Sequence, residues 1–198
     1  MFMIYTCCTL FPNLYLIFML HQCVWICTGQ SLRVIIRCNF TAVVNHQGRY
    51  YAANRGESRI HVFEQQHDRW EQILLFAIDT SVGSYITLGI SNELLYVSSF
   101  LDNKIDAYTL NGVFRFNAGN QGNRAAGEFR WPRICAADAS GALLIADCYN
   151  DRLQVLNAMG HWSIVQLKPH VLMPGGACLV DDTLYVSHQK KHTTVMRK

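Results

Sequence analysis

Histidine and cysteine side chains are the groups in this sequence that could bind a metal ion or act as nucleophiles. Structural metal sites need ligands that converge, usually as close pairs such as C-x-x-C. No such pair occurs among the 8 cysteines and 8 histidines, and the nearest approaches are Cys23 with Cys27 and His188 with His192. The G-x-S-x-G, H-E-x-x-H and phosphate-cradling glycine motifs are also absent from the sequence. We therefore predict no catalytic residue, no metal and no cofactor.

A second set of side chains has the chemistry of a binding surface. Bases of single-stranded RNA stack on aromatic rings while arginine contacts phosphate, and a protein partner can use the same groups. The net charge of +3 gives no reason to expect DNA or an anionic membrane, and no small-molecule substrate is indicated. The candidate partner-binding residues are Arg55, Phe100, Arg124, Arg130, Trp131, Tyr149 and Asn150.

A repeated unit supplies the elements that must position these side chains. In two copies a turn glycine is followed six residues later by a polar residue, and five residues after that by an arginine. A middle copy keeps both intervals with a glycine-free Asn92-Glu93 turn, and a partial copy from Pro174 has Thr193 at the basic position. The basic residues of the three good copies are 45 and 48 positions apart. The repeat positions are Gly48, Asn54 and Arg59, then Ser99 and Lys104, then Pro132, Asp138, Gly141, Asp147 and Arg152.

Short apolar runs bounded by Gly, Asn, Asp or Ser predict β-strands in each copy. Four antiparallel strands in every 40 to 50 residues are typical of the blades of a β-propeller. The sequence therefore predicts an all-β fold with about four blades. We expect a neutral hydrophobic segment at 1–30 and a propeller fragment at 31–198, with repeats near 40–80, 85–125, 127–168 and 173–198.

The third copy resembles the NHL-repeat family. Gly127-Glu128-Phe129 followed by Pro132, the stretch Ala136 to Gly141, Ile145-Ala146-Asp147 and Asn150-Asp151-Arg152-Leu153-Gln154-Val155 match its pattern of G-x-F, proline, V-D-x-x-G, V-A-D and N-x-R-I-x-V. The resemblance covers Thr41 to about Val195 and weakens outside the third copy. It is strongest to the C-terminal propellers of tripartite-motif proteins, which hold RNA or protein targets.

The resemblance implies a non-catalytic target-recognition scaffold of a ubiquitin-ligase-like or post-transcriptional regulatory protein. Family rings have about six blades, so we expect an incomplete ring here, the C-terminal part of a larger protein, with open blade edges that favour self-association. The sequence shows no RING-type ladder of cysteines and histidines, so ligase activity is not expected of this chain.

Strand order predicts where a partner would bind, because second-to-third loops and blade-to-blade links emerge on one side of a propeller. That side would carry all seven candidate residues. Simpler interpretations compete with binding: Trp131 can pack against the neighbouring blade, and Phe100 can seal a blade edge. For Arg59, Lys104 and Arg152 we favour a hydrogen bond or ion pair at a blade corner, with Asp147 in the same role.

The first charged side chain is Arg33, and three interpretations of the neutral segment before it are open. It can be a secretory signal or membrane anchor, a start foreign to the domain, or ordinary propeller strand. Cys135, Cys148 and Cys178 lie in apolar runs as small hydrophobes, which favours a reducing, cytoplasmic location. The Asn39-Phe40-Thr41 sequon matters only if the chain is secreted.

The alternative function is a secreted or anchored propeller related to the peptide-amidating lyases. Some NHL-like propellers are lyases that hold a metal in the central channel, which needs histidines and carboxylates that converge from several blades. The histidines do not recur at an equivalent position of the repeat, so we expect no enzyme. The residues compared are His46, His61, His161, His170 and His188.

Overall fold

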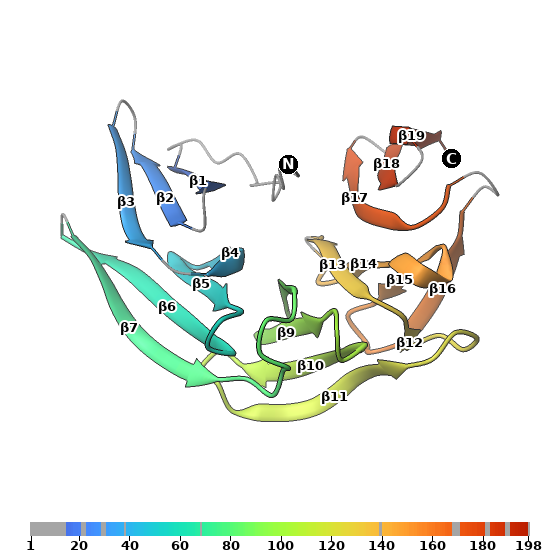
Figure 1. The fold of residues 1–198 in the computed structure, drawn as a ribbon, viewed down its shortest axis with the longest axis horizontal. Helices are drawn as coiled ribbons and strands as arrows, with labels where there is room; N and C mark the ends of the chain where they lie inside the picture. Colours follow the sequence, from blue (N-terminus) through green and yellow to red (C-terminus); the bar gives the residue numbers. More distant parts are fainter. Residues whose placement is uncertain are drawn as a thin grey trace. The chain divides into compact units, whose positions relative to one another are not determined.

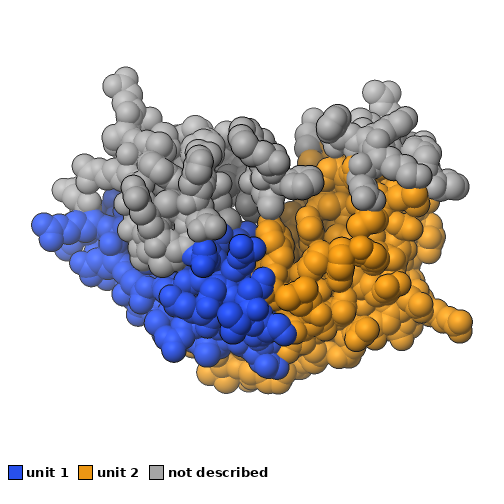
Figure 2. All heavy atoms as spheres, in the orientation of Figure 1, with its two compact units in different colours: residues 1–83 blue, residues 84–198 orange. Residues whose placement is uncertain are grey.

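The computed structural model describes residues 15–20, 23–28, 31–37, 39–67, 69–138, 140–167, 171–180, 183–188 and 191–197. Every described element is a β-strand except one 3-10 turn, η1 (Cys148–Asn150). The prediction of an all-β chain is confirmed. The chain divides into two compact units, residues 1–83 and 84–198, and each is described by itself (Figure 2).

The first unit contains two antiparallel sheets (Figure 1). One has the strand order β1 (Tyr15–Leu20), β2 (Cys23–Thr28) and β3 (Ser31–Arg37). The other has the order β4 (Phe40–His46), β5 (Arg49–Asn54), β6 (Arg59–Gln66) and β7 (Arg69–Ala77). The second sheet is a four-stranded meander of the kind that builds propeller blades. Its core residues Tyr51, Ile60, Val62 and Phe63 are almost completely buried.

Strands β1 and β2 lie in the neutral segment before Arg33. For this segment the sequence left open a signal or anchor, a start foreign to the domain, and propeller strand. The structure places the backbone of Tyr15–Leu20 and Cys23–Thr28 in an antiparallel pair. Residues 1–14, which include Cys7 and Cys8, lie outside the described residues, as do residues 21, 22, 29 and 30 and Cys38. In the described part of the chain, no helix is long and apolar enough to cross a membrane.

The second unit contains three sheets, and the first two are complete blades. The first has the order β8 (Ile86–Ser91), β9 (Leu94–Ser99), β10 (Lys104–Thr109) and β11 (Phe114–Gln121), with β12 (Glu128–Phe129) pairing in parallel with the end of β11. The next has the order β13 (Pro132–Ala137), β14 (Leu143–Asp147), β15 (Arg152–Leu156) and β16 (Trp162–Gln166). The third sheet has β17 (Pro174–Val180), β18 (Thr183–His188) and β19 (Lys191–Arg197).

Two hairpins show how the repeat tolerates a turn without glycine. Gln47 and Gly48 connect β4 to β5 with φ values of 49° and 82°, and Asn92 and Glu93 connect β8 to β9 with φ values of 48° and 58°. Two central residues with positive φ define the type I′ turn, whose twist matches that of the flanking strands. The middle copy therefore uses the same kind of turn, although Glu93 carries a Cβ in the left-handed region that favours glycine.

Two hydrophobic clusters join the sheets of the second unit. One contains Tyr96, Ile105, Phe129, Ile134, Leu143 and Ile145, and thus draws on both complete blades. The other joins the β13–β16 blade to the third sheet through Ala146, Cys148, Leu153, Val171 and Val186. Close approach needs glycine at Gly119, where a Cβ would lie 2.5 Å from the Phe129 ring. Packing of this density fixes one sheet against the next.

Candidate partner-binding site

Loops of the second unit gather at the end of the sheets where β13 begins. The loop after β9 starts at Phe100, whose N–H donates to the Tyr85 carbonyl at 3.0 Å just before β8. The loop after β14 holds Tyr149, whose N–H donates to the Arg130 carbonyl at 3.1 Å in the link that enters β13. Second-to-third loops and blade-to-blade links therefore meet at one end of these sheets, as the strand order requires.

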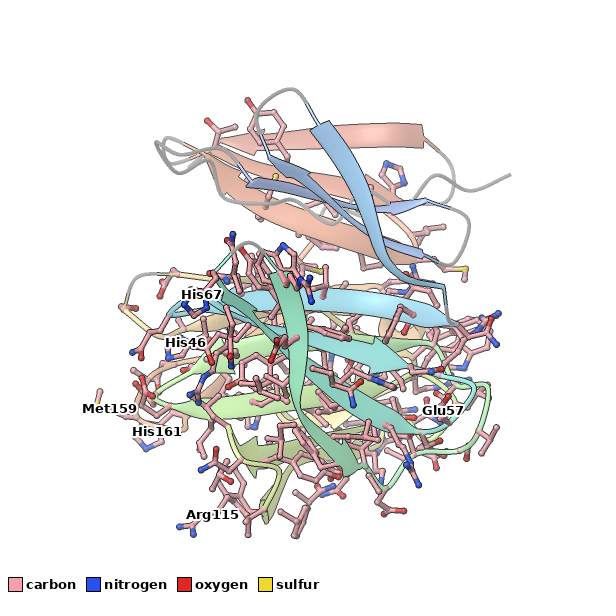
Figure 3. All side chains as sticks on the ribbon, turned by 90° about the vertical axis from the view of Figure 1, so that its left-hand side faces the viewer. His46, Glu57, His67, Arg115, Met159 and His161 are labelled. Atoms are coloured by element: carbon pink, nitrogen blue, oxygen red, sulfur yellow. The ribbon has the colours of Figure 1, made fainter. Side chains whose placement is uncertain are left out.

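The sheet of the first unit shows the same separation of ends. His46 and His67 close the β4–β5 and β6–β7 hairpins, whereas Glu57 lies in the loop between β5 and β6. Figure 3 shows the two histidines together at one end of the sheet and Glu57 at the other. In an antiparallel meander, alternate connections always emerge at opposite ends.

Three aromatic rings pack against one another where the loops of the second unit meet. The Trp131 ring lies 4.2 Å from the Phe100 ring and 3.7 Å from the Tyr149 ring, between ring centroids. Trp131 is half-buried and packs on the cluster that includes Leu153 and Val186. Tyr149 is 39% exposed and Leu101, beside Phe100, is 54% exposed. Much of the Trp131 side chain therefore packs between blades, which was the simpler interpretation of this residue. Tyr149 and Leu101 present apolar surface to solvent.

Two arginines flank these rings. The guanidinium carbon of Arg130 lies 5.6 Å from the centroid of the Tyr149 ring, and that of Arg133 lies 5.1 Å from Tyr85 and 5.3 Å from Phe100. These distances are within the range of cation–π attraction. We call Tyr85, Phe100, Arg130, Trp131, Arg133 and Tyr149 the aromatic–arginine cluster. It combines side chains from two blades of the second unit.

Backbone conformation and one side-chain cap hold Trp131 in place. Trp131 has φ of +60°, an uncommon value for a residue with a large side chain. Its N–H donates to the Asn103 Oδ1 atom at 2.8 Å. The arrangement recurs one blade later, where Met173 has φ of +50° and donates its N–H to Asp151 Oδ1 at 2.7 Å. In these two blades of the second unit, the residue before the basic position of the repeat thus fixes the entry to the next sheet.

A buried ion pair lies beneath the link that carries Arg130 and Trp131. The Arg152 Nε atom donates to Asp147 Oδ2 at 2.8 Å, and both side chains are almost fully buried. Three of the other four Arg152 N–H groups donate to the carbonyls of Arg124, Ala125 and Glu128 at 2.8–3.1 Å. A buried pair whose other hydrogen-bonding groups are also satisfied fixes local geometry. Arg152 therefore holds the backbone of the link at Arg124, Ala125 and Glu128 from its buried position on β15.

The remaining polar groups of the link are satisfied in the same way. The Gln154 side chain donates to the Glu128 carbonyl at 2.7 Å and accepts from the Gly127 N–H at 2.9 Å. The Glu128 carboxylate accepts three backbone N–H groups, from Asn123, Arg124 and Ala125. The N–H groups of Arg124 and Ala125 contribute most to holding the pKa of Glu128 below its usual value.

The structure brings together four of the seven candidate partner-binding residues, namely Phe100, Arg130, Trp131 and Tyr149. Asn150 instead has a structural position, since its amide donates to the Gly122 carbonyl and to both oxygens of Asp147 at 2.9–3.0 Å. Arg124 is exposed in the link. Arg55 belongs to the first unit. Its N–H donates to the Asn39 carbonyl, and its carbonyl accepts the Gly83 N–H.

The repeat positions have different partners in different copies. Lys104 pairs with Asp106 at 3.0 Å, and the Ser99 hydroxyl bonds Asp102 and Ser84. Arg59 is exposed opposite Asn54, which accepts the Gly56 N–H at 3.0 Å. Lys104 and Arg152 thus each form an ion pair of the kind expected at a blade corner. The partners differ because Ser99 does not carry the charge that Asp147 has.

Turn positions of the third copy act locally. The Asp138 carboxylate accepts the N–H groups of Ser140 and Ala142 and the Ser140 hydroxyl at 2.7–2.9 Å, which lowers its pKa, the Ser140 hydroxyl contributing most. Gly141 and the turn residue Gly48 both have positive φ, +84° and +82°, and Pro132 is buried at the start of β13.

Three residues with a role at this site, Tyr85, Asn103 and Arg133, were not predicted from the sequence. Tyr85 precedes β8 as Trp131 precedes β13, so comparison of the copies position by position could have found it. Asn103 precedes Lys104 as Asp151 precedes Arg152, and the same comparison would have identified both caps. Arg133 has no basic counterpart in the other copies, because Thr87 stands at the second position of β8 and Gly175 at that of β17. Nothing in the sequence distinguished it.

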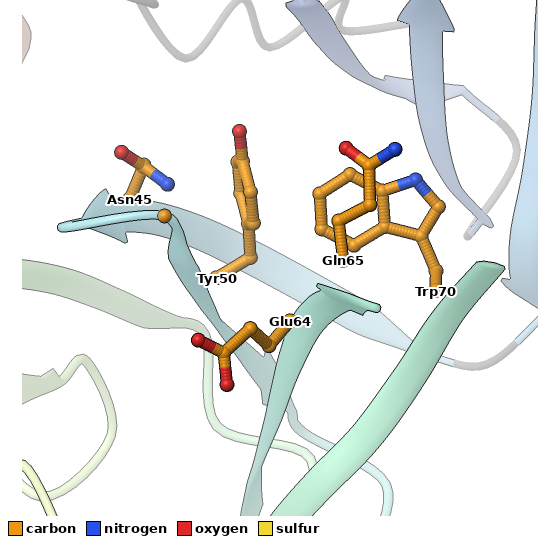
Figure 4. Close-up of a pocket in the computed structure, with 6 residues that line it drawn as sticks. Asn45, Tyr50, Glu64, Gln65 and Trp70 are labelled. Atoms are coloured by element: carbon orange, nitrogen blue, oxygen red, sulfur yellow. The ribbon is translucent and has the colours of Figure 1, made fainter. Parts of the chain in front are cut away.

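A shallow pocket of about 310 Å³ in the first unit is a weaker candidate site (Figure 4). Figure 4 shows Tyr50, Gln65 and Trp70 projecting to one side of the sheet and Glu64 to the other. The Tyr50 and Trp70 rings already pack edge to face at 5.0 Å, and the Gln65 amide donates to the His67 carbonyl. The pocket therefore lies on the face of a sheet, where its groups largely satisfy one another.

His61 is buried, with Nδ1 2.7 Å from Gln72 Oε1 and Nε2 3.3 Å from a Glu57 carboxylate oxygen. Nδ1 thus has an internal partner, whereas Nε2 is buried near the Glu57 carboxylate without a hydrogen bond. Among the described residues, no group of three or more His, Cys, Asp or Glu side chains could hold a metal ion.

Comparison with solved structures shows the fold. A Bacteroides thetaiotaomicron protein of unknown function has a TM-score of 0.70 at 14% identity, over 92% of this chain and 56% of its own. A chain of a nidogen/laminin complex has a TM-score of 0.62 at 16% identity, over 88% and 67%. Virginiamycin B lyase from Staphylococcus aureus has a TM-score of 0.55 at 10% identity, over 81% and 56%.

These structures identify the sheets of this chain as β-propeller blades. Identities of this size show the fold alone. The chain spans little more than half the length of the Bacteroides protein and of the lyase. No protein family matches the sequence, and no curated protein resembles it closely enough to be recognised as a relative. The resemblance to NHL repeats thus stays a prediction, while the propeller prediction is confirmed.

Proposed function

We propose that this chain is a non-catalytic binding module whose partner docks on the aromatic–arginine cluster. The observation that carries the proposal is the convergence of four rings and two guanidinium groups from two blades at the loop end of the second unit. Tyrosine, tryptophan and arginine are the residues that most often dominate the energy of protein interfaces. Exposed Leu101 adds an apolar contact at the margin of the cluster.

A protein or peptide partner fits this surface better than single-stranded RNA. RNA recognition by stacking needs open ring faces, one for each base. Here Trp131 is half-buried with the Phe100 and Tyr149 rings against it, and Tyr149 alone of the four rings is more than a third exposed. Binding of RNA in place of a peptide would therefore contradict the proposal of a protein partner. The nidogen/laminin complex offers a fold-level analogy for a propeller with a protein partner.

The wider role follows from the resemblance to NHL repeats. We propose the target-recognition part of a ubiquitin-ligase-like or post-transcriptional regulatory protein in the cytoplasm. The alternative is a secreted or anchored propeller related to the amidating lyases. Determination of the mature first residue and of glycosylation at the exposed Asn39 separates them. A processed N-terminus with a glycan at Asn39 would contradict the cytoplasmic role.

The binding proposal is tested by selection and substitution. The protein is used to select binders from a random-peptide phage library, and binding of a labelled 12-nucleotide poly(U) RNA is measured in parallel. We expect Tyr149→Ala to weaken the selected peptides about tenfold or more, which corresponds to loss of one interface aromatic.

A matched control comes from the other end of the same blade. Met159 in the β15–β16 hairpin is 80% exposed. Because alternate connections of a meander emerge at opposite ends, this hairpin lies at the end opposite η1. Met159→Ala should leave peptide affinity unchanged. If no peptide is selected, or if both variants lose affinity equally, the cluster is not the binding surface.

A further inference from the structure

Arg133 carries a positive charge that the described residues do not compensate. Its Nε–H is buried and has no hydrogen-bond partner among the described residues. The guanidinium donates one hydrogen bond, from Nη1 to the Gly175 carbonyl at 3.5 Å, which is longer than a normal N–H···O bond. No described carboxylate lies within ion-pair distance of Arg133. A half-buried guanidinium with five N–H groups and one weak acceptor is unusual, because buried polar groups are normally satisfied.

Arg152, on the same blade, shows what a purely structural arginine is like here. It has a carboxylate at 2.8 Å and three backbone carbonyls, so its charge and its N–H groups are used internally. Arg133 instead lies against the faces of Tyr85 and Phe100. Rings attract the cation, but they accept no conventional hydrogen bonds and supply no negative charge.

The other groups near the cluster do not neutralise Arg133. Burial raises the pKa of Cys135 to about 11 and that of Cys148 to about 12, so both thiols are neutral at physiological pH. The carboxylates of the same loops have other partners. Asp147 pairs with Arg152, Asp102 accepts the Ser99 hydroxyl, and Asp151 accepts the Met173 N–H.

We infer that Arg133 binds a carboxylate of the partner, with the rings of the cluster receiving an apolar side chain next to it. The inference rests on the proposed function and specifies its ligand as an acidic peptide segment. A planar carboxylate matches the geometry of a guanidinium fork and accepts charge-assisted hydrogen bonds. Arg130, exposed beside Tyr149, reinforces the positive potential at the margin. Leu101 and Phe100 supply the apolar contact.

Peptides selected by phage display provide the probe. We expect them to be enriched in Asp or Glu next to an apolar residue. Arg133→Met should weaken binding of a selected peptide about 30-fold or more, the usual effect of truncating one member of a buried charge pair. Replacing the acidic residue of the peptide by its amide should have a similar effect, and the two changes together should cost little more than either alone.

Folding of the variant is checked separately. Because Arg133 makes few compensating contacts, Arg133→Met should keep the Tm of the wild type or raise it. Arg115→Met, which removes an exposed arginine from β11 of the same unit, is the matched control and should leave binding unchanged. Arg133→Lys keeps the charge without the planar fork and should bind more weakly than the wild type.

The outcomes separate the inference from the function on which it rests. Selected peptides that show no acidic enrichment, or whose affinity is unaffected by Arg133→Met, would overturn the carboxylate inference and leave the binding module intact. Binding of poly(U) without selection of peptides would overturn both in favour of RNA. Additive effects of Arg133→Met and of the peptide amide would also exclude a direct pair.

Discussion

At the scale of single residues, burial decides the chemistry of side chains that look alike in the sequence. Arg133 and Arg152 lie on the first and third strands of one blade, yet the Arg152 guanidinium is enclosed by acceptors and the Arg133 guanidinium lies against rings. Cys135 and Cys148 show the same principle, because burial raises the pKa of each thiol. Residue type alone therefore does not assign a role to either group.

The buried thiols give a prediction about reactivity. The thiolate is the nucleophile, and burial raises the pKa of Cys135 from 9.0 to about 11 and that of Cys148 to about 12. We expect both to react with iodoacetamide far more slowly at pH 8 in the native protein than in urea. Each should gain reactivity only as the pH approaches the pKa of its own thiol. Peptide mapping by mass spectrometry after timed labelling measures this, and equal native and denatured rates would show that the two sites are open.

At the scale of elements, turns and caps repeat more faithfully than side-chain contacts. The positive φ values at Asn103 and Asp151 recur immediately before a basic residue, and in both cases the side-chain oxygen caps the entry to the next inner strand. Asparagine and aspartate suit this position because they tolerate the left-handed conformation and carry a short acceptor. The loop after the second strand of one blade thus fixes, through a side-chain hydrogen bond, where the first strand of the next blade begins.

The glycine-free turn of the middle blade gives a prediction about stability. Glu93 has φ of 58° in the β8–β9 hairpin, which strains a residue with a Cβ. Glu93→Gly should raise the free energy of unfolding by about 0.5–1 kcal/mol, the relief of strain exceeding the added chain entropy. Glu93→Ala keeps the Cβ and serves as the control. Urea denaturation that finds the alanine variant equally stabilised would attribute the effect to the lost carboxylate.

At the scale of the whole molecule, the division into two compact units makes the effect of a core substitution local. Arg152→Met leaves Asp147 buried without a cation, which should cost about 3–5 kcal/mol. Amides of β13–β16 should then exchange hydrogen faster, whereas amides of β4–β7 should keep their protection. Hydrogen exchange with mass spectrometry tests this, with Arg115→Met as control, and uniform loss of protection through both units would indicate a single cooperative domain.

The repeat in the sequence was sufficient to predict blades, because strands, turns and the spacing between them are local properties that recur. Short apolar runs, hairpin turns and the interval from Gly141 to Arg152 predicted the β13–β16 meander directly. The same periodicity predicted the end of the sheets at which Phe100, Arg130, Trp131 and Tyr149 lie. These statements need chain order alone, since alternate connections of a meander emerge at opposite ends.

The tertiary structure alone decided which side chains meet and which remain unsatisfied. Sequence spacing could not show that Trp131 packs between Phe100 and Tyr149 or that the Asn150 amide is hydrogen-bonded to Asp147. Nor could it show that the Nε–H of Arg133 has no acceptor among the described residues. Contacts of this kind join residues far apart in the chain, and their energies depend on burial and on the exact direction of each donor. Sequence therefore determined the blades and the face, and packing between blades determined the site.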